Sequence, residues 1–345
     1  MKLIDKVKVQ HSVCYDFLTS LIRLNHNKYF SPKDKPNKEI YNLMEDLQQK
    51  VPGDINNKLE QFFDKDTAYG MTTVGFIKKN EFKEIPEFID YLKQVSPKEI
   101  IWRFLYIGIG PNGYISLEDV EQLLGDNNRS IQFINENLSL SGEQKWLILQ
   151  FLTDPYTTKD NLIELLEWHY HNFYNEYQNY IAKFIKKYEI ELKDRLKKYG
   201  QEYLNILIPY DYSDPGEIEE LTIAVSYFYE KSNLLNLMED IFVFGYRFPE
   251  TVESEHALLS SIQVFKALSD ETRLNIIRLL AERPWYGHEL AQKLNVSNST
   301  ISHHVAQLVS NGLIRSYRQD NRLYFALDIE KMKKTITKSV DDILE

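Results

Sequence analysis

The most informative segment of the chain is Val296-Ser-Asn-Ser-Thr-Ile-Ser-His-His-Val-Ala-Gln-Leu-Val-Ser-Asn-Gly-Leu-Ile314. It begins with small hydroxyl and amide side chains, the residue types that most often cap a helix. Apolar residues then recur at helical spacing, at Ile301, Val305, Leu308 and Val309. The polar residues fall off that stripe, so the segment predicts an amphipathic helix with one packed face and one polar face.

Residues 286–294, just upstream, predict a second helix close to the first. Their sequence is YGHELAQKL, with Leu290, Ala291 and Leu294 on the inward side, and only residues 295–297 separate the two helices. Two short helices joined by so tight a turn are typical of a helix-turn-helix, in which the second helix enters the major groove of DNA.

Two short strands are predicted downstream of these helices. Gly312 ends the second helix, and residues 313–317 and 322–327 have the composition of strands. The polar residues 318–321 between them predict a hairpin turn. A hairpin in this position would be the wing of a winged helix-turn-helix.

Three motifs follow one another across this region: Phe265-Lys-Ala-Leu-Ser-Asp-Glu-Thr-Arg-Leu-Asn-Ile-Ile-Arg-Leu-Leu280, then Ser299-Thr-Ile-Ser-His-His304, then Gly312-Leu-Ile314. In these residues, their order and their spacing, the chain resembles the ArsR-type winged helix-turn-helix transcription regulators. The resemblance covers roughly a fifth of the chain. It implies a homodimer that binds double-stranded DNA at an operator near its own promoter, usually as a repressor, and that is released when an effector binds.

The polar face of the predicted recognition helix supplies most of the expected DNA contacts. Short polar side chains at a helix start reach phosphates and base edges, and amides can bond adenine through two hydrogen bonds. The predicted contact residues of this helix are Ser297, Asn298, Ser299, Thr300, Ser302, His303, His304 and Gln307. For the two histidines, the resemblance favours a DNA-facing or helix-packing role over metal binding.

Basic residues flank the predicted wing. Arg315, Arg318 and Arg322 are expected to enter the minor groove or to touch phosphate, with Tyr324 in support. In a twofold dimer the two recognition helices would read an inverted repeat, with half-sites about 34–36 Å apart.

Length and composition leave room for a second domain. The chain has 345 residues, more than a winged helix-turn-helix needs, with 43% hydrophobic and 27% charged residues, as in ordinary globular proteins. The single cysteine, Cys14, excludes a disulfide framework or a thiolate cluster within one chain. The sequence has no run of 18 apolar residues and no signal-peptide core, so we expect no membrane contact and a cytoplasmic location.

The net charge of −10 is unevenly divided. From Leu258 to Glu345 there are 12 Lys and Arg against 10 Asp and Glu, about +2, which leaves 29 against 41, about −12, for the rest of the chain. Because phosphates repel an acidic surface, the N-terminal part is not expected to lie along DNA.

Residues 1–250 predict one domain that binds an effector or a partner, and residues 257–345 predict the winged helix-turn-helix domain, with a polar linker at 249–255. The fold class is therefore mainly α (α+β), with a large helical N-terminal domain and a small sheet. Helices are expected at 12–24, 39–50, 55–63, 82–95, 96–107, from 116, at 141–152 and from about 158 to 199. Strands are expected around 3–9 and at 205–209, 220–229 and 240–247, and the first is expected to pair with the later ones. This order also resembles a group of longer regulators whose N-terminal domain has no assigned role.

Residues 162–180 are unusually aromatic. One interpretation is an aromatic stripe that packs the core of a helical domain. The alternative is an effector pocket, because tyrosines combine a flat apolar body with a hydroxyl group. The residues that would line such a pocket are Trp168, Tyr170, Tyr174 and Tyr177.

Residues 108–113, GIGPNG, match the letters of a dinucleotide-binding loop. That loop needs a strand before it and a helix that opens at its glycines, whereas here a helix is predicted before it and Pro111 lies inside it. The context favours a turn between helices.

Two flanking helices are expected to form the dimer contact. Residues 257–268 and 329–344 are apolar or amphipathic, and in ArsR-type regulators such helices pair across the dimer axis. Packing within one chain is the alternative for both helices.

The sequence lacks the ligands of metal-sensing regulators and the residue groupings of common active sites. Metal-sensing members of the family use cysteines in the first helix of the motif, or acidic and histidine ligands on the last helix. Residues 283–290 contain no cysteine and residues 329–344 contain no histidine, so we expect neither a metal nor another cofactor. No nucleophile elbow or phosphate loop in its proper context occurs either, so we expect no catalytic residue and no enzyme activity.

The sequence therefore predicts a DNA-binding transcriptional regulator, a homodimeric repressor whose N-terminal domain senses a small molecule or a partner. One alternative is an enzyme or a protein-interaction domain fused to an autoregulatory DNA-binding domain. Another is a constitutive repressor that binds no ligand.

Overall fold

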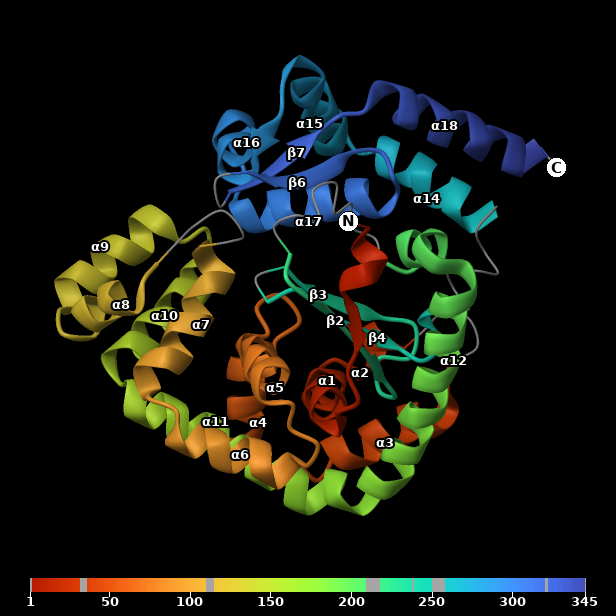
Figure 1. The fold of residues 1–345 in the computed structure, drawn as a ribbon. Helices are drawn as coiled ribbons and strands as arrows, with labels where there is room; N and C mark the ends of the chain where they lie inside the picture. The colour runs from red at the N-terminus through yellow and green to blue at the C-terminus, as the bar shows by residue number, and fades with distance from the viewer. Residues whose placement is uncertain are drawn as a thin grey trace.

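The computed structural model of the protein describes residues 2–31, 36–109, 115–208, 218–237, 239–249, 258–319 and 322–344. The buried apolar side chains of these residues form two clusters, one from Leu3 to Phe248 and the other from Val264 to Phe325. Figure 1 shows the corresponding two bodies, with the C-terminal helices and strands stacked on the larger N-terminal domain. Within the described ranges, no helix has both the length and the apolar character needed to span a bilayer.

A four-stranded sheet lies inside the N-terminal domain. Its strands are β1 (Val7–Val9), β2 (Leu221–Ser226), β3 (Asn233–Asn236) and β4 (Ile241–Gly245), in the order β1-β2-β4-β3. β1 runs parallel to β2, β2 runs parallel to β4, and only β3 is antiparallel to its neighbour. The predicted pairing of the first strand with the later ones is confirmed, because Val7, Lys8 and Val9 lie opposite Leu221, Thr222 and Ile223. β2 and β4 are buried along their whole length, which fits their continuous apolar sequence.

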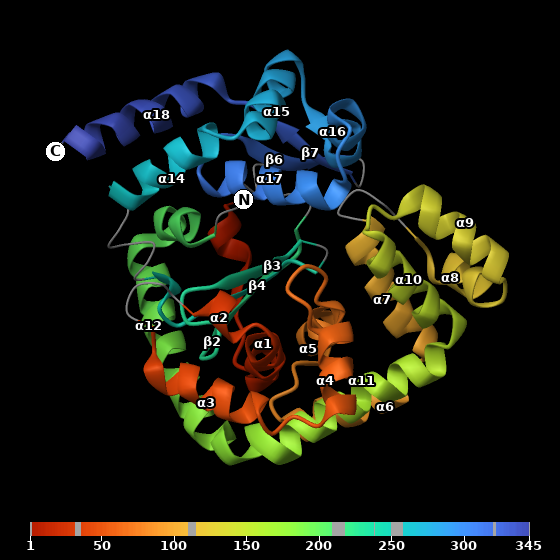
Figure 2. The same ribbon diagram turned by 180° about the vertical axis from the view of Figure 1, so that it is seen from behind.

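Helices surround this sheet. The first half of the domain contributes η1 (Leu3–Lys6), α1 (Val13–Asn25), α2 (Asn27–Phe30), α3 (Lys38–Gln48), α4 (Gly53–Phe62), η2 (Tyr69–Thr73), α5 (Val74–Asn80), α6 (Ile85–Gln94) and α7 (Pro97–Ile109). The second half contributes α8 (Leu117–Leu124), α9 (Asn127–Asn137), α10 (Gly142–Thr153), α11 (Pro155–His169), a π-helical turn η3 (Tyr170–Tyr174) and α12 (Asn175–Leu207). In Figure 2 the long α12 and α11 curve around the outside of the domain, with α1 between α12 and α5. The glycine-rich segment begins in α7, and its residues 110–113 lie outside the described residues.

The strand predicted at 205–209 is wrong. Gly200, with a φ of 59° and a ψ of −135°, is not helical and marks a kink in α12, but the residues after it are helical again up to Leu207. Tyr203, Leu204 and Leu207 are buried, which is the spacing of a helix face and not the alternation of a strand. The composition of this apolar run favours a strand, whereas burial of one helical face determines the conformation.

The C-terminal domain has the expected winged helix-turn-helix elements. They are α14 (Leu258–Leu268), α15 (Glu271–Glu282), β5 (Trp285–Tyr286), α16 (Gly287–Leu294), α17 (Asn298–Ser310), β6 (Arg315–Gln319), β7 (Arg322–Ala326) and α18 (Ile329–Leu344). The strands form an antiparallel sheet in the order β5-β7-β6. Arg318 and Gln319 belong to β6 and not to the predicted turn, whose residues 320 and 321 lie outside the described residues. Most of the predicted linker, residues 250–255, also lies outside them.

The arrangement of the two bodies places α17 between them. In both Figure 1 and Figure 2, α17 forms the underside of the C-terminal domain, and strand β3 and helices α5 and α7 of the N-terminal domain point toward it. Helices α14 and α18 pack against each other at one end of the C-terminal domain.

Candidate nucleic-acid interface

Helix α17 begins and packs as its sequence predicts. The Ser297 hydroxyl caps it by accepting a hydrogen bond of 3.1 Å from the backbone N–H of Thr300. Ile301, Val305 and Leu308 are buried against the C-terminal core, while Val309 is half-buried. Ser299, Ser302, His303 and other small polar side chains are exposed, so the helix presents a polar face opposite its packed one.

The predicted contact residues of α17 are not equally available. Ser297, Ser299, Ser302 and His303 are exposed, and Asn298, Thr300, His304 and Gln307 are half-buried. The Gln307 side-chain oxygen accepts a hydrogen bond of 2.5 Å from Arg273 Nη1, so a two-bond contact to adenine requires that bond to break. The sequence interpretation did not include Arg273, although it lies within the first of the three motifs.

His304 is turned toward the N-terminus of α15. Its Nδ1 atom lies 3.6 Å from the Asp270 carboxylate, which caps α15 by accepting from the backbone N–H of Arg273. Partial burial lowers the pKa of His304, and the nearby Asp270 charge opposes that shift. The geometry matches the helix-packing role that was one of the two expected for this histidine. His303, which is exposed, lies on the outward face.

The wing carries its basic residues on a platform of aromatic rings. Tyr317 and Tyr324 stack across β6 and β7, with ring centroids 5.7 Å apart, and Tyr286 packs edge-on against Tyr324. The guanidinium of Arg322 lies 5.5 Å from the centre of the Tyr286 ring, and that of Arg315 lies 5.7 Å from Tyr317. Such cation–π contacts orient a cation without neutralising it, so both remain available to phosphate.

The third wing cation is engaged with the N-terminal domain. Arg318 Nη1 lies 3.9 Å from Oδ1 of Asp240, at the start of β4. Leu237, in the turn after β3, packs against the hydrophobic cluster of the C-terminal domain. The sequence interpretation missed both Asp240 and Leu237, because nothing in their local sequence indicates a contact with the C-terminal domain.

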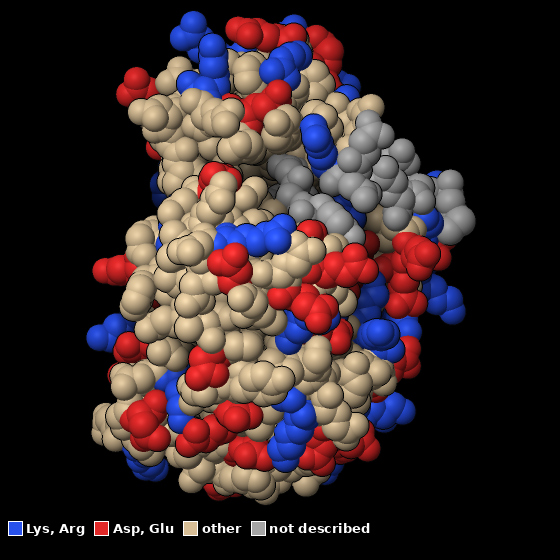
Figure 3. Space-filling model, turned by 90° about the vertical axis from the view of Figure 1, so that its left-hand side faces the viewer, with Lys and Arg blue, Asp and Glu red and all other residues tan. Residues whose placement is uncertain are grey.

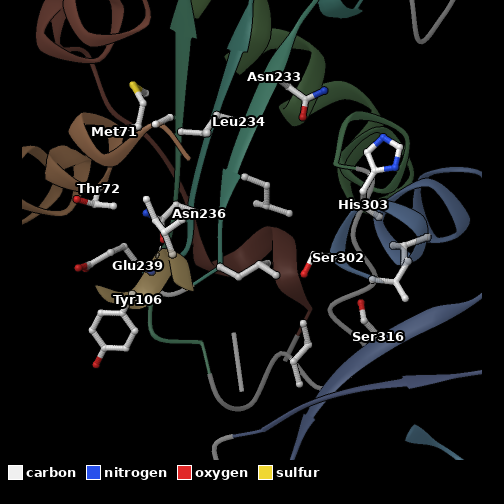
Figure 4. Close-up of a pocket in the computed structure, with 18 of the residues that line it drawn as sticks. Met71, Thr72, Tyr106, Asn233, Leu234, Asn236, Glu239, Ser302, His303 and Ser316 are labelled. Carbon is white, nitrogen blue, oxygen red and sulfur yellow. Dashed lines mark hydrogen bonds between the residues drawn. The ribbon is translucent and has the colours of Figure 1, made fainter. Parts of the chain in front are cut away.

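A cavity of about 670 Å³ separates the polar face of α17 from the N-terminal domain, and we call it the interdomain cavity. Its N-terminal wall includes Thr72, Trp102, Arg103, Asn233, Leu234 and Glu239. Its C-terminal wall includes Ser302, His303, Ala306, Gln307, Ser316 and Phe325. Figure 4 shows labelled residues of both walls around this space, with Ser302 and Ser316 on the side of the C-terminal domain.

The position of this cavity matters for DNA binding. A recognition helix must enter a major groove about 12 Å wide and 8.5 Å deep. Here the outward face of α17 faces the N-terminal domain across the interdomain cavity, which Ser302, His303 and Gln307 line. In this conformation the N-terminal domain lies on the side from which a major groove would have to approach these residues.

The four aromatic residues of the expected effector pocket lie elsewhere and do not line the interdomain cavity. Tyr174 is fully buried, and its hydroxyl donates a hydrogen bond of 2.7 Å to Asp16. Trp168, Tyr170 and Tyr177 are half-buried and pack against the same hydrophobic cluster. For Tyr174, this placement corresponds to the core-packing interpretation.

A buried polar network surrounds Tyr174. The Asp16 carboxylate accepts hydrogen bonds from the hydroxyl of Ser226 and from the backbone N–H groups of Tyr227 and Phe228, at 2.6 to 3.1 Å. Burial raises the Asp16 pKa, and these hydrogen bonds oppose the shift. His169 bonds to the Ser20 hydroxyl at 2.7 Å, and burial lowers its pKa to about 3. These groups are enclosed by the core and do not line the interdomain cavity.

One face of the N-terminal domain carries mixed charge. On the face in Figure 3, acidic and basic side chains alternate over the N-terminal domain, and its described residues form no continuous basic tract there. Such a surface does not follow a phosphate backbone. Among the residues that the structure describes, no three His, Cys, Asp or Glu side chains gather as metal ligands.

Similarity to known proteins falls on the C-terminal domain. The family described as "Bacterial regulatory protein, arsR family" matches residues 270–316. The transcriptional repressor SdpR of Bacillus subtilis is 33% identical over 73 residues, which cover 21% of this chain and 81% of the repressor. The arsenic resistance transcriptional regulator ArsR2 of Pseudomonas putida is 40% identical over 77 residues, covering 21% of this chain and 64% of that regulator.

A third relative also matches over only part of its length. The HTH-type transcriptional regulator KmtR of Mycobacterium tuberculosis is 28% identical over 79 residues, covering 23% of this chain and 61% of the regulator. The matched segment therefore spans less than two thirds of KmtR and of ArsR2, and these similarities leave the N-terminal domain without a counterpart.

Proposed function

Because this chain belongs to the arsR family of bacterial regulatory proteins through its C-terminal domain, we propose that it is a homodimeric repressor whose N-terminal domain senses a small molecule or a partner. The regulator binds an inverted-repeat operator through α17 and the wing. The observation that carries this proposal is the capped helix α17, which has a packed apolar face and an outward polar face inside an arsR-type domain.

Helices α14 and α18 support the dimer. They pack against each other, and Met332 and Ile336 of α18 also contact the C-terminal cluster. Apolar side chains nevertheless remain exposed on this pair, with 37% of Phe265, 52% of Ile329 and 41% of Val340 accessible. A second copy of the chain would cover them and would present a second α17 to the other half-site.

The position of the N-terminal domain supports the proposed sensing role. It contacts the wing through Asp240 and the C-terminal cluster through Leu237, and it faces α17 across the interdomain cavity. A signal that changes this contact would change access to the recognition helix. A ligand shifts such an equilibrium only if it binds one of the two arrangements more tightly than the other.

The proposal gives the N-terminal domain no catalytic role. Its strongly perturbed groups Asp16, His169 and Tyr174 are fully buried and bonded to core residues. An active site would need such groups to converge on a cleft that a substrate can reach.

The test is binding of the purified full chain to a labelled duplex from the region upstream of its own coding sequence, followed by fluorescence anisotropy over a salt series. We expect binding that weakens steeply with salt, and a complex of two protomers per duplex by sedimentation. A scrambled duplex of the same composition is the control. Equal affinity for the two duplexes would overturn the proposed sequence-specific repressor, and one protomer per duplex would overturn the dimer.

A further inference from the structure

The interdomain cavity has the size and lining of a small-molecule site. Its volume of about 670 Å³ lies within the range of about 300 to 1,000 Å³ that is typical of ligand pockets. Trp102, Leu234, Leu235, Val305 and Phe325 make much of its wall apolar. An unfilled apolar space of this size favours an occupant, because its lining lacks the contacts that a packed core supplies.

The charges around the cavity indicate a neutral occupant. Among the described lining residues, Arg103 is the one guanidinium or ammonium and Glu239 the one carboxylate, and they pair with each other. The Arg103 guanidinium also lies 4.0 Å from the centre of the Phe76 ring. A charged ligand would therefore enter without a free counter-ion, which is costly in an apolar site.

Two polar groups at the cavity lack partners among the described residues. Ser316 is fully buried and lines the cavity, and its hydroxyl oxygen makes no hydrogen bond to the described part of the chain. The Nε–H of Arg103, whose side chain is more than nine-tenths buried, likewise has no partner there. Buried donors are nearly always satisfied, so these groups indicate a missing acceptor. Both atoms have almost no accessible surface, so a hydroxyl or carbonyl oxygen on the ligand would reach them after a small rearrangement of the cavity wall.

We propose that the interdomain cavity is the effector site and that it binds a neutral, mainly apolar small molecule carrying a hydroxyl or carbonyl oxygen. The ligand touches both domains and stabilises the arrangement in which α17 faces the N-terminal domain. It therefore releases the regulator from DNA. This inference rests on the proposed function and adds the location and the chemical class of its effector.

The linkage between the two sites gives the expected effect. DNA can bind α17 only after α17 leaves the cavity, whereas the ligand needs both walls of the cavity to stay in place. DNA and the ligand must therefore weaken each other's binding by the same factor. Couplings of this kind commonly reach about 5- to 150-fold.

The test uses the full chain and the neutral apolar fluorophore N-phenyl-1-naphthylamine, whose emission rises in an apolar site. Thr72→Trp fills the cavity from the N-terminal wall and Ala306→Trp fills it from α17. Thr153→Trp, on the exposed surface of α10 and outside the cavity lining, is the matched control. Urea unfolding of each variant establishes that it is folded.

We expect the wild type and Thr153→Trp to bind the fluorophore alike, and both filling variants to lose at least tenfold in affinity. We also expect the upstream duplex to displace the fluorophore, and saturating fluorophore to weaken DNA binding by at least fivefold. Equal fluorophore binding by all folded variants, or none by the wild type, would overturn the site. Fluorophore binding that is confined to the cavity but leaves DNA affinity unchanged would overturn its role as effector site.

These results are separate from the proposed function. DNA binding without fluorophore is measured by anisotropy, and its sequence specificity tests the proposed repressor whether or not the cavity binds anything. Specific DNA binding together with failed cavity binding would overturn only the effector site.

Discussion

Arg318 Nη1, in the wing strand β6, lies 3.9 Å from Asp240 Oδ1, at the start of strand β4 in the N-terminal domain. A residue expected to meet DNA is thus paired with an acidic residue of the N-terminal domain. Leu237, three residues before Asp240, packs against the C-terminal cluster. The same short connection therefore holds both the wing and the underside of the C-terminal domain.

Asp240→Asn is expected to raise the affinity for the upstream duplex by about two- to fivefold. The substitution removes the charge that holds Arg318, and partly exposed ion pairs contribute about 0–1 kcal/mol. Fluorescence anisotropy at fixed salt measures the change. Asp160→Asn, on the exposed surface of α11, is the charge-matched control and should leave the affinity as it is. A lower affinity for Asp240→Asn would show that Asp240 assists DNA binding.

Leu237→Asp is expected to raise DNA affinity by at least about fivefold. A carboxylate cannot remain against the C-terminal cluster, so the arrangement in which α17 faces the N-terminal domain loses that contact. The variant should also lose affinity for N-phenyl-1-naphthylamine. Leu117→Asp, at the exposed first turn of α8, is the matched control. If Leu237→Asp bound DNA and fluorophore like the wild type, the contact of Leu237 with the C-terminal cluster would not regulate DNA binding.

Gln307→Ala and Arg322→Ala should separate base readout from phosphate contact. We expect Gln307→Ala to relax preference at one base position, with a loss of about 1–3 kcal/mol on the preferred base. Arg322→Ala should weaken binding to all duplexes alike and reduce the salt slope by about 1. Anisotropy with matched and scrambled duplexes distinguishes these patterns. Identical losses for both variants on both duplexes would contradict the division of roles.

His169→Gln is expected to flatten the pH dependence of stability. Burial lowers the His169 pKa to about 3, whereas the unfolded chain titrates near 6.5. Between these values the unfolded state binds a proton that the folded state does not, so the free energy of unfolding falls as pH falls, by about 1.4 kcal/mol per pH unit. Asp16, whose pKa is raised, acts in the opposite direction, so the comparison must be between variant and wild type.

Urea unfolding at several pH values between 6.5 and 4 measures that slope. The slope of His169→Gln should be smaller than that of the wild type. His171→Gln, two positions along and exposed, is the control and should keep the wild-type slope. An unchanged slope in His169→Gln would mean that His169 does not resist protonation in the folded state.

Local sequence predicted the elements whose burial follows a simple period. Ile301, Val305 and Leu308 gave α17 its packed face, and Ser297 gave it its cap. Strand β3 was missed because Asn233-Leu-Leu-Asn236 is short and has neither β-branched residues nor alternation, and it forms only by pairing with β4. The helix through Leu207 was missed because an apolar run at a kinked helix end resembles a buried strand.

The sequence predicted the individual residues of the DNA-contacting surface but not the residues that face them. The polar residues of α17 were identified from their position on the helix, yet nothing in their sequence indicates what faces them. Asp240, Leu237 and the N-terminal wall of the interdomain cavity lie far away in the chain and become neighbours only when both domains fold. Contacts between distant segments leave no periodic pattern in the local sequence, so a single sequence does not reveal them.

The most direct test of the central claim, that the N-terminal domain occludes the recognition helix, is a distance measurement by double electron–electron resonance on the full chain. Spin labels are placed at Lys293→Cys on α16 and Glu118→Cys on α8, both exposed, while the native Cys14 is buried and protected from labelling. Addition of the upstream duplex should shift the label-to-label distance to a longer and distinct population, because α17 must leave the N-terminal domain to enter the major groove. An unchanged distance distribution in a saturated DNA complex would contradict the account.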